Sequence, residues 1–413
     1  MSTSAIIKHL PTTLEDRYAN IDITLNEIHH HGSHSSINIG EPIKWKSPKT
    51  LSGPTIWSGA DFEHNDSFTL YLSAEDIEEV EHALQVFKTL EVDVDGIAKS
   101  NFVLPSLSKK LEEIVESIHN GQGFFVIRGL DMSRYTVEDG IILYLGIATY
   151  IGDKRGLQDR KGNVLAHITS SKAWDVPMNQ RHGIHSTMAL PFHSDMGCDI
   201  LALQVRHSAL DGGSTFLSSA STIFNRLSED EPEVVETLLE PSWPVQYSGK
   251  EARYYLAPAM TVHQGRLMAS MDPKRFGPHP ASSGTTIPAL SKRQEYALDR
   301  VGQVARATDL RLNLKRGDLL FFNNWAVLHR REAYDDHGEA SSRHLVRMWL
   351  RNTEHGWSVP PSMKLPWQSA YGDGAKHQTR VYAMEPEPKY SVPKYSAGSA
   401  AFLLEDSDDD SDN

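Results

Sequence analysis

Apolar residues recur at helical spacing in the first third of the chain and at strand spacing in much of the rest. The segment 72–90 has apolar residues every three or four positions from Ile77 to Phe87, and Ser73 with Asp76 forms a capping-box signature. This pattern predicts a helix that buries one face. Two further helices and one buried strand are predicted nearby, at 105–121, 137–152 and 123–130 respectively.

From residue 190 the apolar runs become short and are separated by Gly, Pro and Asp. Such runs predict many short strands, which are typical of a sandwich or a jelly-roll barrel. Two helical inserts, 221–240 and 290–308, interrupt them, so we expect an α+β fold that is mainly β, with flanking helices. The predicted strands are 199–206, 212–220, 244–249, 266–271, 310–314, 318–324 and 343–351.

The ends of the chain differ in composition from the middle. Residues 1–50 are polar and rich in turn-forming residues, and 392–413 is rich in Ser and Asp. We therefore predict a polar N-terminal extension, a single domain over 51–391 and a disordered acidic tail over 392–413. Within the domain, 154–187 has few apolar runs and is predicted to cover the substrate.

Charge and cysteine content narrow the functional classes. The formal net charge is −13, and the last eleven residues contain six acids, so the remainder carries −7. Without a basic block the sequence does not favour a nucleic-acid partner. The single cysteine, Cys198, fits a reducing compartment, and the N-terminal stretch lacks a long apolar core. We expect a soluble cytoplasmic protein without a membrane partner.

The stretch "LPFHSDMGCDILALQ" (190–204) has the apolar content of a buried strand but begins with two polar residues. In one continuous strand His193 and Asp195 would lie on the same face, because side chains alternate with a period of two. Taken alone, they could be a polar pair that ends a strand or two ligands of a metal site.

A third residue favours the metal site. In "RGDLLFFNNWAVLHRREAYDD" (316–336) an apolar strand follows a Gly-Asp turn, and His329 comes shortly after its predicted end. Two histidines and one carboxylate suit a facial triad that leaves coordination positions open for O₂ and a chelating co-substrate. A closed zinc site rich in cysteine is not available to a chain with one cysteine.

The predicted strand "SSRHLVRMWLRN" (341–352) carries two arginines on one face, Arg343 and Arg347. Buried guanidinium groups need anionic partners, which could be ligands in an elongated pocket or carboxylates of the protein. Thr215 follows the pair Gly212-Gly213 and could offer its hydroxyl to the same carboxylate as Arg343, or belong to an ordinary turn and strand.

Together these motifs resemble the taurine dioxygenase-like branch of the Fe(II)/2-oxoglutarate-dependent oxygenases, near the clavaminate synthase-like proteins. The matching segments are "FHSDMGCDILALQ", "GGSTFLSS", "RGDLLFFNNWAVLHRREAY" and "RHLVRMWLR", which follow one another in the family's order. The resemblance covers about 102 to 352. The separation of His329 and Arg343 is a few residues longer than in taurine dioxygenase itself, and "DDHGEASS" is the segment that absorbs the difference.

The resemblance implies a double-stranded β-helix, the jelly roll, with His193, Asp195 and His329 as the ligands of Fe(II). It implies that Arg343, assisted by Thr215, binds the distal carboxylate of 2-oxoglutarate. In family members that act on anionic substrates a second arginine contacts the substrate, and Arg347 stands at that position. The implied reaction couples decarboxylation of 2-oxoglutarate, with O₂, to oxidation of a C–H bond.

The sequence therefore predicts an enzyme that releases succinate and CO₂ while it oxidises a small organic acid, with an amino acid as one candidate. Hydroxylation, desaturation and cyclisation remain open. So do two alternatives: a metalloenzyme of the same barrel that does not use 2-oxoglutarate, and a binding barrel without catalysis.

Overall fold

The computed structural model describes residues 50–159, 161–247, 253–278, 287–335, 343–376 and 378–390. The predicted N-terminal extension, apart from its last residue, and the predicted acidic tail lie outside the described residues.

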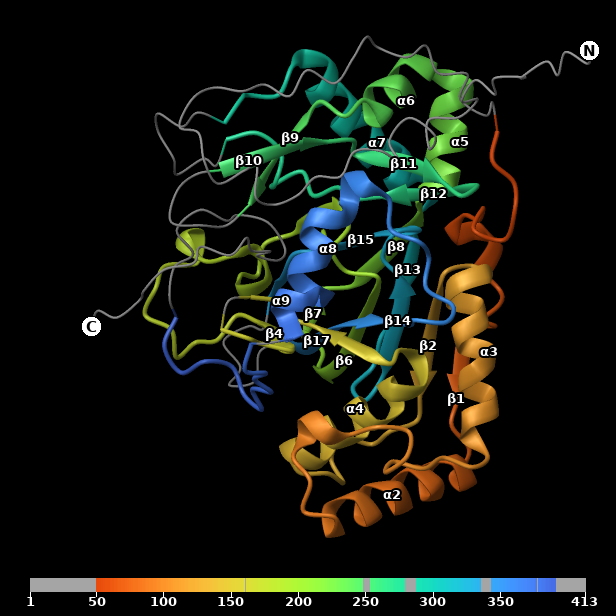
Figure 1. Cartoon of the computed structure of the whole chain (residues 1–413), viewed down its shortest axis with the longest axis vertical. Helices are drawn as coiled ribbons and strands as arrows, with labels where there is room; N and C mark the ends of the chain where they lie inside the picture. Colours follow the sequence, from red (N-terminus) through yellow and green to blue (C-terminus); the bar gives the residue numbers. More distant parts are fainter. Residues whose placement is uncertain are drawn as a thin grey trace, which may run out of the picture.

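Two β-sheets face each other and form the centre of the molecule (Figure 1). The larger has seven strands and is antiparallel except for its first pair. Its order is β1 (Thr69–Tyr71), β2 (Phe124–Arg128), β14 (Leu319–Asn323), β6 (Ile200–His207), β17 (His344–Arg351) and β3 (Lys154–Gly156), with β4 (Leu165–Thr169) also paired to β17. The smaller sheet has the order β13 (Leu310–Leu312), β8 (Thr215–Ser219), β15 (Val327–Arg331) and β5 (Leu190–His193).

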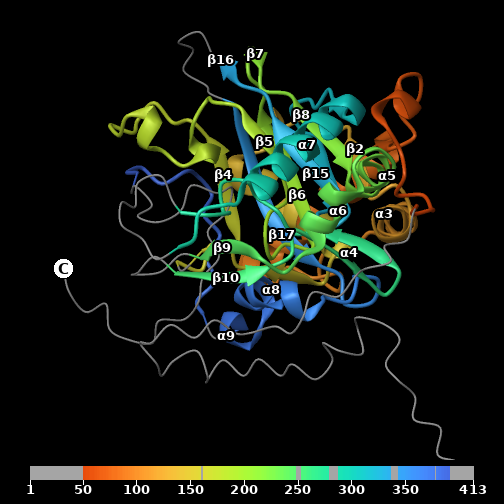
Figure 2. The ribbon, with the colours of Figure 1, turned by 90° about the horizontal axis from the view of Figure 1, so that it is seen from above.

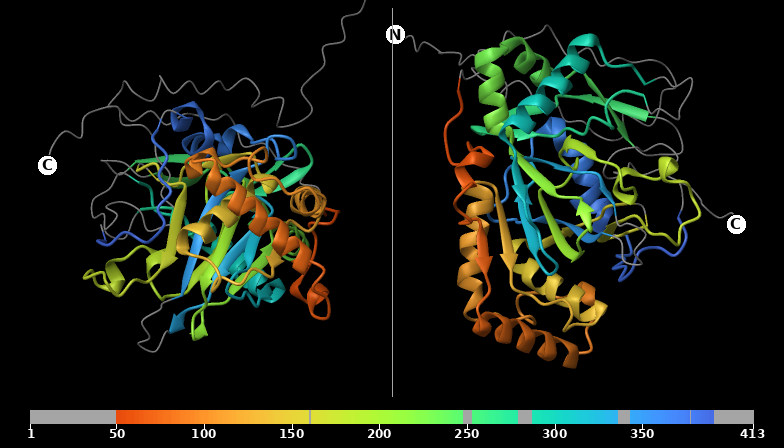
Figure 3. Two further views of the ribbon diagram at one scale, coloured as in Figure 1. Left: turned by 90° about the horizontal axis from the view of Figure 1, so that it is seen from below. Right: turned by 180° about the vertical axis from the view of Figure 1, so that it is seen from behind.

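Helices cover the outer face of each sheet. The larger sheet packs against α2 (Ala74–Thr89), α3 (Leu107–Asn120) and α4 (Val137–Ile151). From below, α2 crosses the end of the molecule beside α4 (Figure 3). The smaller sheet packs against α5 (Ala220–Asp230), α6 (Pro232–Leu239) and α7 (Lys292–Thr308), which lie over it in Figure 2.

Smaller elements complete the described parts of the chain. Three strand pairs join β9 (Trp243–Tyr247) to β10 (Arg253–Ala257), β11 (Met260–His263) to β12 (Arg266–Ala269), and β7 (Asp211–Gly212) to β16 (Tyr334–Asp335). Two helices follow β17, α8 (Lys364–Tyr371) and α9 (Asp373–Lys376). Single 3₁₀ turns occur at Gly59–Phe62, Val94–Gly96, Met178–Gln180, Gly183–His185 and Pro361–Met363.

Alternation along the strands separates an inner from an outer core. On β17, Val346 and Met348 pack outward against the α2–α4 layer, whereas Leu345 and Trp349 pack between the two sheets. On β15, Leu328 packs outward toward α5–α7. Residues on the inner faces of both sheets therefore point at one another, and this is where polar side chains have the greatest need of partners.

Most predicted elements are confirmed, including the α+β class with a jelly-roll core and flanking helices. At α2 the Ser73 hydroxyl accepts from the Asp76 backbone N–H, and the Asp76 carboxylate accepts from the Ser73 N–H at 2.9 Å. The insert 221–240 is two helices rather than one, because Pro232 begins a new helix and cannot continue the previous one. The predicted covering segment 154–187 contains β3 and β4.

The stretch 190–204 is not one strand, which corrects the sequence interpretation. Residues 190–193 form β5 in the smaller sheet, and β6 begins only at Ile200, in the larger sheet. Asp195 thus lies in a corner between the two sheets. His329 follows the end of β14, as predicted, and lies within a further strand, β15.

None of the described helices is both long enough and apolar enough to cross a membrane. The cytoplasmic location stays a prediction.

A buried histidine pair connects β4, β17 and the segment after α9. The His167 Nε2 donates to the Ala383 carbonyl at 2.9 Å, and its Nδ1 lies 2.9 Å from His344 Nε2. With both rings neutral, His167 Nδ1 accepts the Nε2 proton of His344. Burial lowers the pKa of His167 to about 4 and that of His344 to about 2.

We expect the free energy of unfolding to decrease as the pH is lowered from 7.5 to 5.5. The unfolded chain binds protons on these imidazoles below about pH 6.5, whereas the folded chain does not, and each contributes about 1 kcal/mol to the decrease. Urea unfolding at pH 7.5 and at pH 5.5 measures this decrease in the free energy of unfolding. In His344→Asn the decrease should be smaller by about that amount, and exposed His82→Gln serves as the control. An unchanged pH dependence in His344→Asn would contradict the neutral pair.

Candidate metal centre

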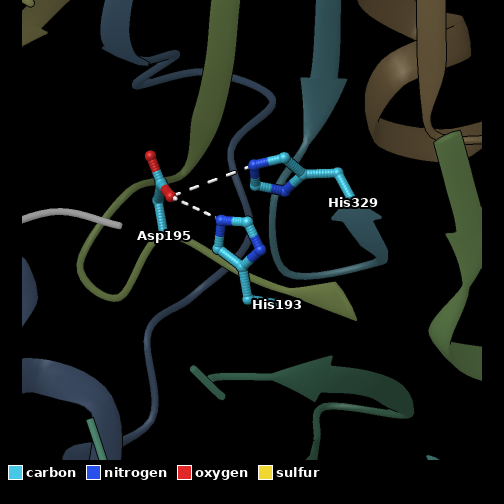
Figure 4. Close-up of side chains that lie close together, drawn as sticks. All are labelled: His193, Asp195 and His329. Atoms are coloured by element: carbon cyan, nitrogen blue, oxygen red, sulfur yellow. Dashed lines mark ion pairs between the residues drawn. The ribbon is translucent and has the colours of Figure 1, made fainter. Parts of the chain in front are cut away.

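Three side chains predicted as ligands converge between the sheets (Figure 4). His193 ends β5 and His329 lies opposite it on β15, so strand pairing alone places the two imidazoles side by side, with ring centroids 4.1 Å apart. Asp195 approaches from the corner after β5. Its Oδ1 lies 3.6 Å from His193 Nε2 and 4.0 Å from His329 Nε2. One donor atom from each residue lies within 4.8 Å of the others.

The two imidazoles are held in a state suited to metal binding. The His193 Nδ1 donates to the Pro191 carbonyl at 2.8 Å, which orients the ring so that its Nε2 faces Asp195. Burial, with the His193 ring next to it, holds the pKa of His329 well below its usual value. His193 and Asp195 are both buried, and Asp195 is fully so.

The two oxygens of Asp195 have different neighbours. Oδ2 accepts from Trp349 Nε1 at 3.1 Å and from Arg347 Nη1 at 2.8 Å, both on the inner face of β17. Arg347 is fixed in turn, because its Nε donates to Gln158 Oε1 at 2.7 Å. Oδ1 is thereby aimed at the imidazoles, which is the arrangement of a carboxylate that would bind a metal through one oxygen.

Asn324 joins the corner that carries Asp195 to the corner between β14 and β15. Its side-chain oxygen accepts from the Asp195 N–H at 2.9 Å, and its amide nitrogen donates to the Asp195 and Cys198 carbonyls, each at 2.8 Å. Its own N–H donates to the Asp199 carbonyl at 2.8 Å. The corner is therefore ordered by a buried side chain rather than by strand pairing.

Arg343 and Thr215 lie at the other end of the inner faces. The Arg343 Nε donates to the Gly213 carbonyl at 3.0 Å, which places the guanidinium against the turn that precedes Thr215. Gly213 has φ +71°, and a Cβ there would lie 2.9 Å from the Arg343 Cδ. A residue with a side chain would be strained and crowded, so the two-glycine turn is needed for this approach.

Sequence reasoning grouped the three candidate ligands and missed the residues that position them. Alternation puts Trp349 on the same face of the strand as Arg347, but it does not reveal a hydrogen bond to Asp195. Asn324 and Gln158 had no recognisable signal, since both act through contacts with residues more than 100 positions away. Arg347 was expected at the substrate and is found on a candidate ligand.

The residues fit a redox-active divalent metal of the iron type. Two imidazole nitrogens and one carboxylate oxygen are the donor set of the facial triad, which leaves other coordination positions open. Among the parts of the chain that the structure describes, this is the one group of three His, Cys, Asp or Glu side chains with a common focus.

Comparison with known proteins agrees with this geometry. A family model described as "Taurine catabolism dioxygenase TauD, TfdA family" matches residues 87–349, which include the three candidate ligands and both arginines. The chain belongs to this family. The resemblance identified from the motifs is thereby confirmed.

Two relatives of the TauD/TfdA chain match most of its length. The taurine hydroxylase-like protein SAT17 of Stachybotrys chartarum is 31% identical over 345 residues, which is 82% of this chain and 89% of the relative. The FR-33289 synthase of Streptomyces rubellomurinus is 25% identical over 326 residues, 76% of this chain and 94% of the relative.

Solved structures of the same fold include asparagine oxygenase and the non-heme iron oxygenase OrfP. Asparagine oxygenase with Fe(II), 2S,3S-3-hydroxyasparagine and succinate has a TM-score of 0.54 and 16% identity, over 70% of this chain and 98% of that one. OrfP with Fe, succinate and (3S)-hydroxy-L-Arg has a TM-score of 0.52 and 16% identity. The match covers 68% of this chain and 94% of the OrfP chain. At this identity they show that the TauD/TfdA chain shares their fold.

We expect His193→Ala and His329→Ala each to abolish binding of one equivalent of Co(II), because two of the three donors cannot hold the ion in competition with water. Isothermal titration and the visible Co(II) spectrum measure this. His119→Asn removes a buried histidine that lies in α3, outside the centre, and should bind Co(II) like the wild type. Retention of the Co(II) spectrum in either ligand variant would contradict the site.

We further expect Trp349→Phe to weaken Co(II) binding about tenfold, since hydrogen bonds that orient a ligand typically contribute that much. The substitution removes the indole donor to Asp195 Oδ2 and keeps the aromatic ring. The same titration measures the change. Trp243→Phe removes an equally buried indole that donates to Thr237 instead, and it should leave the affinity unaltered.

Proposed function

We propose that the protein is an Fe(II)- and 2-oxoglutarate-dependent oxygenase that oxidises a C–H bond of a small carboxylate-bearing substrate. The observation that carries this proposal is the buried convergence of His193, Asp195 and His329, with one Asp195 oxygen held by Trp349 and Arg347 and the other turned to the imidazoles. Iron bound there would couple the decarboxylation of 2-oxoglutarate by O₂ to oxidation of the substrate, with release of succinate and CO₂.

The spacing of the inner-face residues supports 2-oxoglutarate as the co-substrate. Leu217 of β8 lies opposite His329, and Thr215 lies two residues further along the same face. Two residues of a strand span about 7 Å. A five-carbon dicarboxylate that chelates a metal at the triad would bring its distal carboxylate to the region of Thr215 and Arg343. Arg343 would supply the charge and Thr215 a hydroxyl.

Arg347 supports a substrate that carries a carboxylate. The guanidinium lies at the metal ligands, already shared between Asp195 and Gln158. A substrate carboxylate at Arg347 would therefore meet the same group that orients Asp195, so substrate binding and ligand geometry would be coupled. Amino acids are candidates, because the asparagine oxygenase and OrfP complexes of the same fold contain hydroxylated amino acids.

The remaining residues would order the site and exclude water. Ser194 lies between two of the ligands, its N–H donates to the Met271 carbonyl at 2.7 Å, and its hydroxyl accepts from the Met271 N–H at 2.9 Å. The segment after β12 thus packs directly on the ligand-bearing corner. A cytosolic location is also part of the proposal, supported by the one cysteine of the sequence, Cys198, which is buried.

We expect anaerobic protein with Fe(II) to give a weak visible charge-transfer band on addition of 2-oxoglutarate, and succinate after air is admitted. Small carboxylates and amino acids are then screened for stimulated succinate release. Fe(II) binding without a 2-oxoglutarate band would favour an enzyme of the same barrel that does not use this co-substrate. Absence of Fe(II) binding would favour a binding barrel.

Arg343→Gln should raise the Kd for 2-oxoglutarate at least tenfold, the usual loss when a charge-assisted hydrogen bond is removed. Fe(II) affinity, measured on the same sample without 2-oxoglutarate, should stay near the wild-type value. Arg347→Leu should lose substrate stimulation and also bind Fe(II) less tightly. Equal losses of Fe(II) and 2-oxoglutarate in Arg343→Gln would make that arginine structural.

A further inference from the structure

A third buried arginine, Arg331, shares the inner face of β15 with His329. In the β15–β8 register His329 lies opposite Leu217 and Arg331 opposite Thr215. Leu217 packs between the sheets, whereas Leu328 packs outward toward α5–α7. Arg331 and Thr215 therefore both point inward, one strand repeat beyond the metal ligand.

The Arg331 guanidinium is only partly satisfied by the protein. Its Nη2 donates to the carbonyls of Ser186, at 2.8 Å, Gly183, at 3.4 Å, and Met188. Its Nε and Nη1 are buried without a hydrogen-bond partner, and the residue is 4% exposed. Unmet donors on a buried cation are costly, so they indicate a place that an anion occupies in the working protein. Burial also lowers the pKa of Arg331 to about 10.

Tyr334 connects Arg331 to Arg343. The two guanidinium carbons lie 5.1 Å and 5.8 Å from the centroid of the Tyr334 ring, within the range of a cation–π contact. The Tyr334 hydroxyl is buried and also has no hydrogen-bond partner. An anion placed between the two guanidinium groups would be attracted to both.

We propose that Arg331 and Tyr334 complete, with Arg343 and Thr215, the subsite for the distal carboxylate of the 2-oxo acid, and that Arg331 is a specificity-determining residue. This inference rests on the proposed function and goes beyond it, because it assigns the selection of the co-substrate to a second guanidinium. The three carbonyls at Nη2 hold Arg331 in place before the ligand arrives, so little conformational freedom is lost on binding.

The experiment compares two ligands of equal chain length. 2-Oxoglutarate ends in a second carboxylate, and 2-oxopentanoate ends in a methyl group. Each is titrated anaerobically into the Fe(II) protein through the charge-transfer band. Arg331→Met should raise the Kd for 2-oxoglutarate at least tenfold and change the Kd for 2-oxopentanoate less than twofold.

Two milder variants keep the test informative if Arg331→Met folds poorly. Tyr334→Phe removes only the hydroxyl. It should raise the Kd for 2-oxoglutarate about threefold to tenfold, again with little effect on the Kd for 2-oxopentanoate. Arg331→Lys keeps the positive charge and should recover part of the discrimination. The matched control is Arg330→Met, because Arg330 is the next residue on the same strand but faces outward onto Phe216 and Asp309.

The outcomes separate the subsite from the proposed function. If Arg331→Met raises the Kd for both 2-oxo acids by the same factor, the arginine acts only by holding the segment 183–188, and the inference is overturned. An unchanged Kd for 2-oxoglutarate in both Arg331→Met and Tyr334→Phe also overturns it. If the wild-type Fe(II) protein binds neither 2-oxo acid, the proposed function fails, and the subsite fails with it.

Discussion

The candidate site depends on one buried amide, the side chain of Asn324, which ties together the two corners where the chain passes from one sheet to the other. Three hydrogen bonds from this side chain and one from its backbone fix the residues 195–199 against the turn after β14. His193 precedes the first corner and His329 follows the second. β5 and β15 pair within the smaller sheet and set the two imidazoles side by side, and the amide fixes the corner that brings Asp195 to them.

Burial of the Asp195 carboxylate requires partners on both oxygens. Trp349 and Arg347 satisfy Oδ2 from the inner face of β17, and Oδ1 faces the two imidazoles. A carboxylate with one oxygen fixed in this way cannot easily rotate, and a ligand with a fixed orientation loses less conformational freedom when a metal binds. The same contact gives Arg347 two roles, because a guanidinium that neutralises Asp195 also lies where a substrate anion would arrive.

Periodicity and capping signals were sufficient for the helices and for most strands, because those features are local. The helix at 74–89 begins at the predicted cap, and β17 (His344–Arg351) coincides with the predicted strand 343–351 to within one residue. The stretch 190–204 was predicted to be one strand because its apolar residues continue through the corner between β5 and β6. Met196 and Cys198 are buried in this corner without belonging to a strand. Local patterns cannot distinguish a buried corner from a buried strand.

The residues that could not be predicted act across long separations in the sequence. Asn324 stands in a run that ends a strand, where asparagine usually signals only a turn. Arg331 stands beside Arg330, and because no strand was predicted there, alternation could not assign one to the inner core and the other to Phe216. Once β15 is known, alternation and the β15–β8 register give that difference.

Strand register therefore sets the dimensions of the site. On β17, Trp349 and Arg347 reach Asp195, Leu345 packs in the inner core, and Arg343 reaches Gly213. A slip of one residue would turn all four outward into the helical layer and bury two guanidinium groups among apolar side chains. β17 is paired along one edge with β6 and along the other with β3 and β4. Pairing on both edges opposes such a slip. β17 spans the distance from the candidate metal centre to the proposed subsite for the distal carboxylate, and its position in the larger sheet is fixed from both sides.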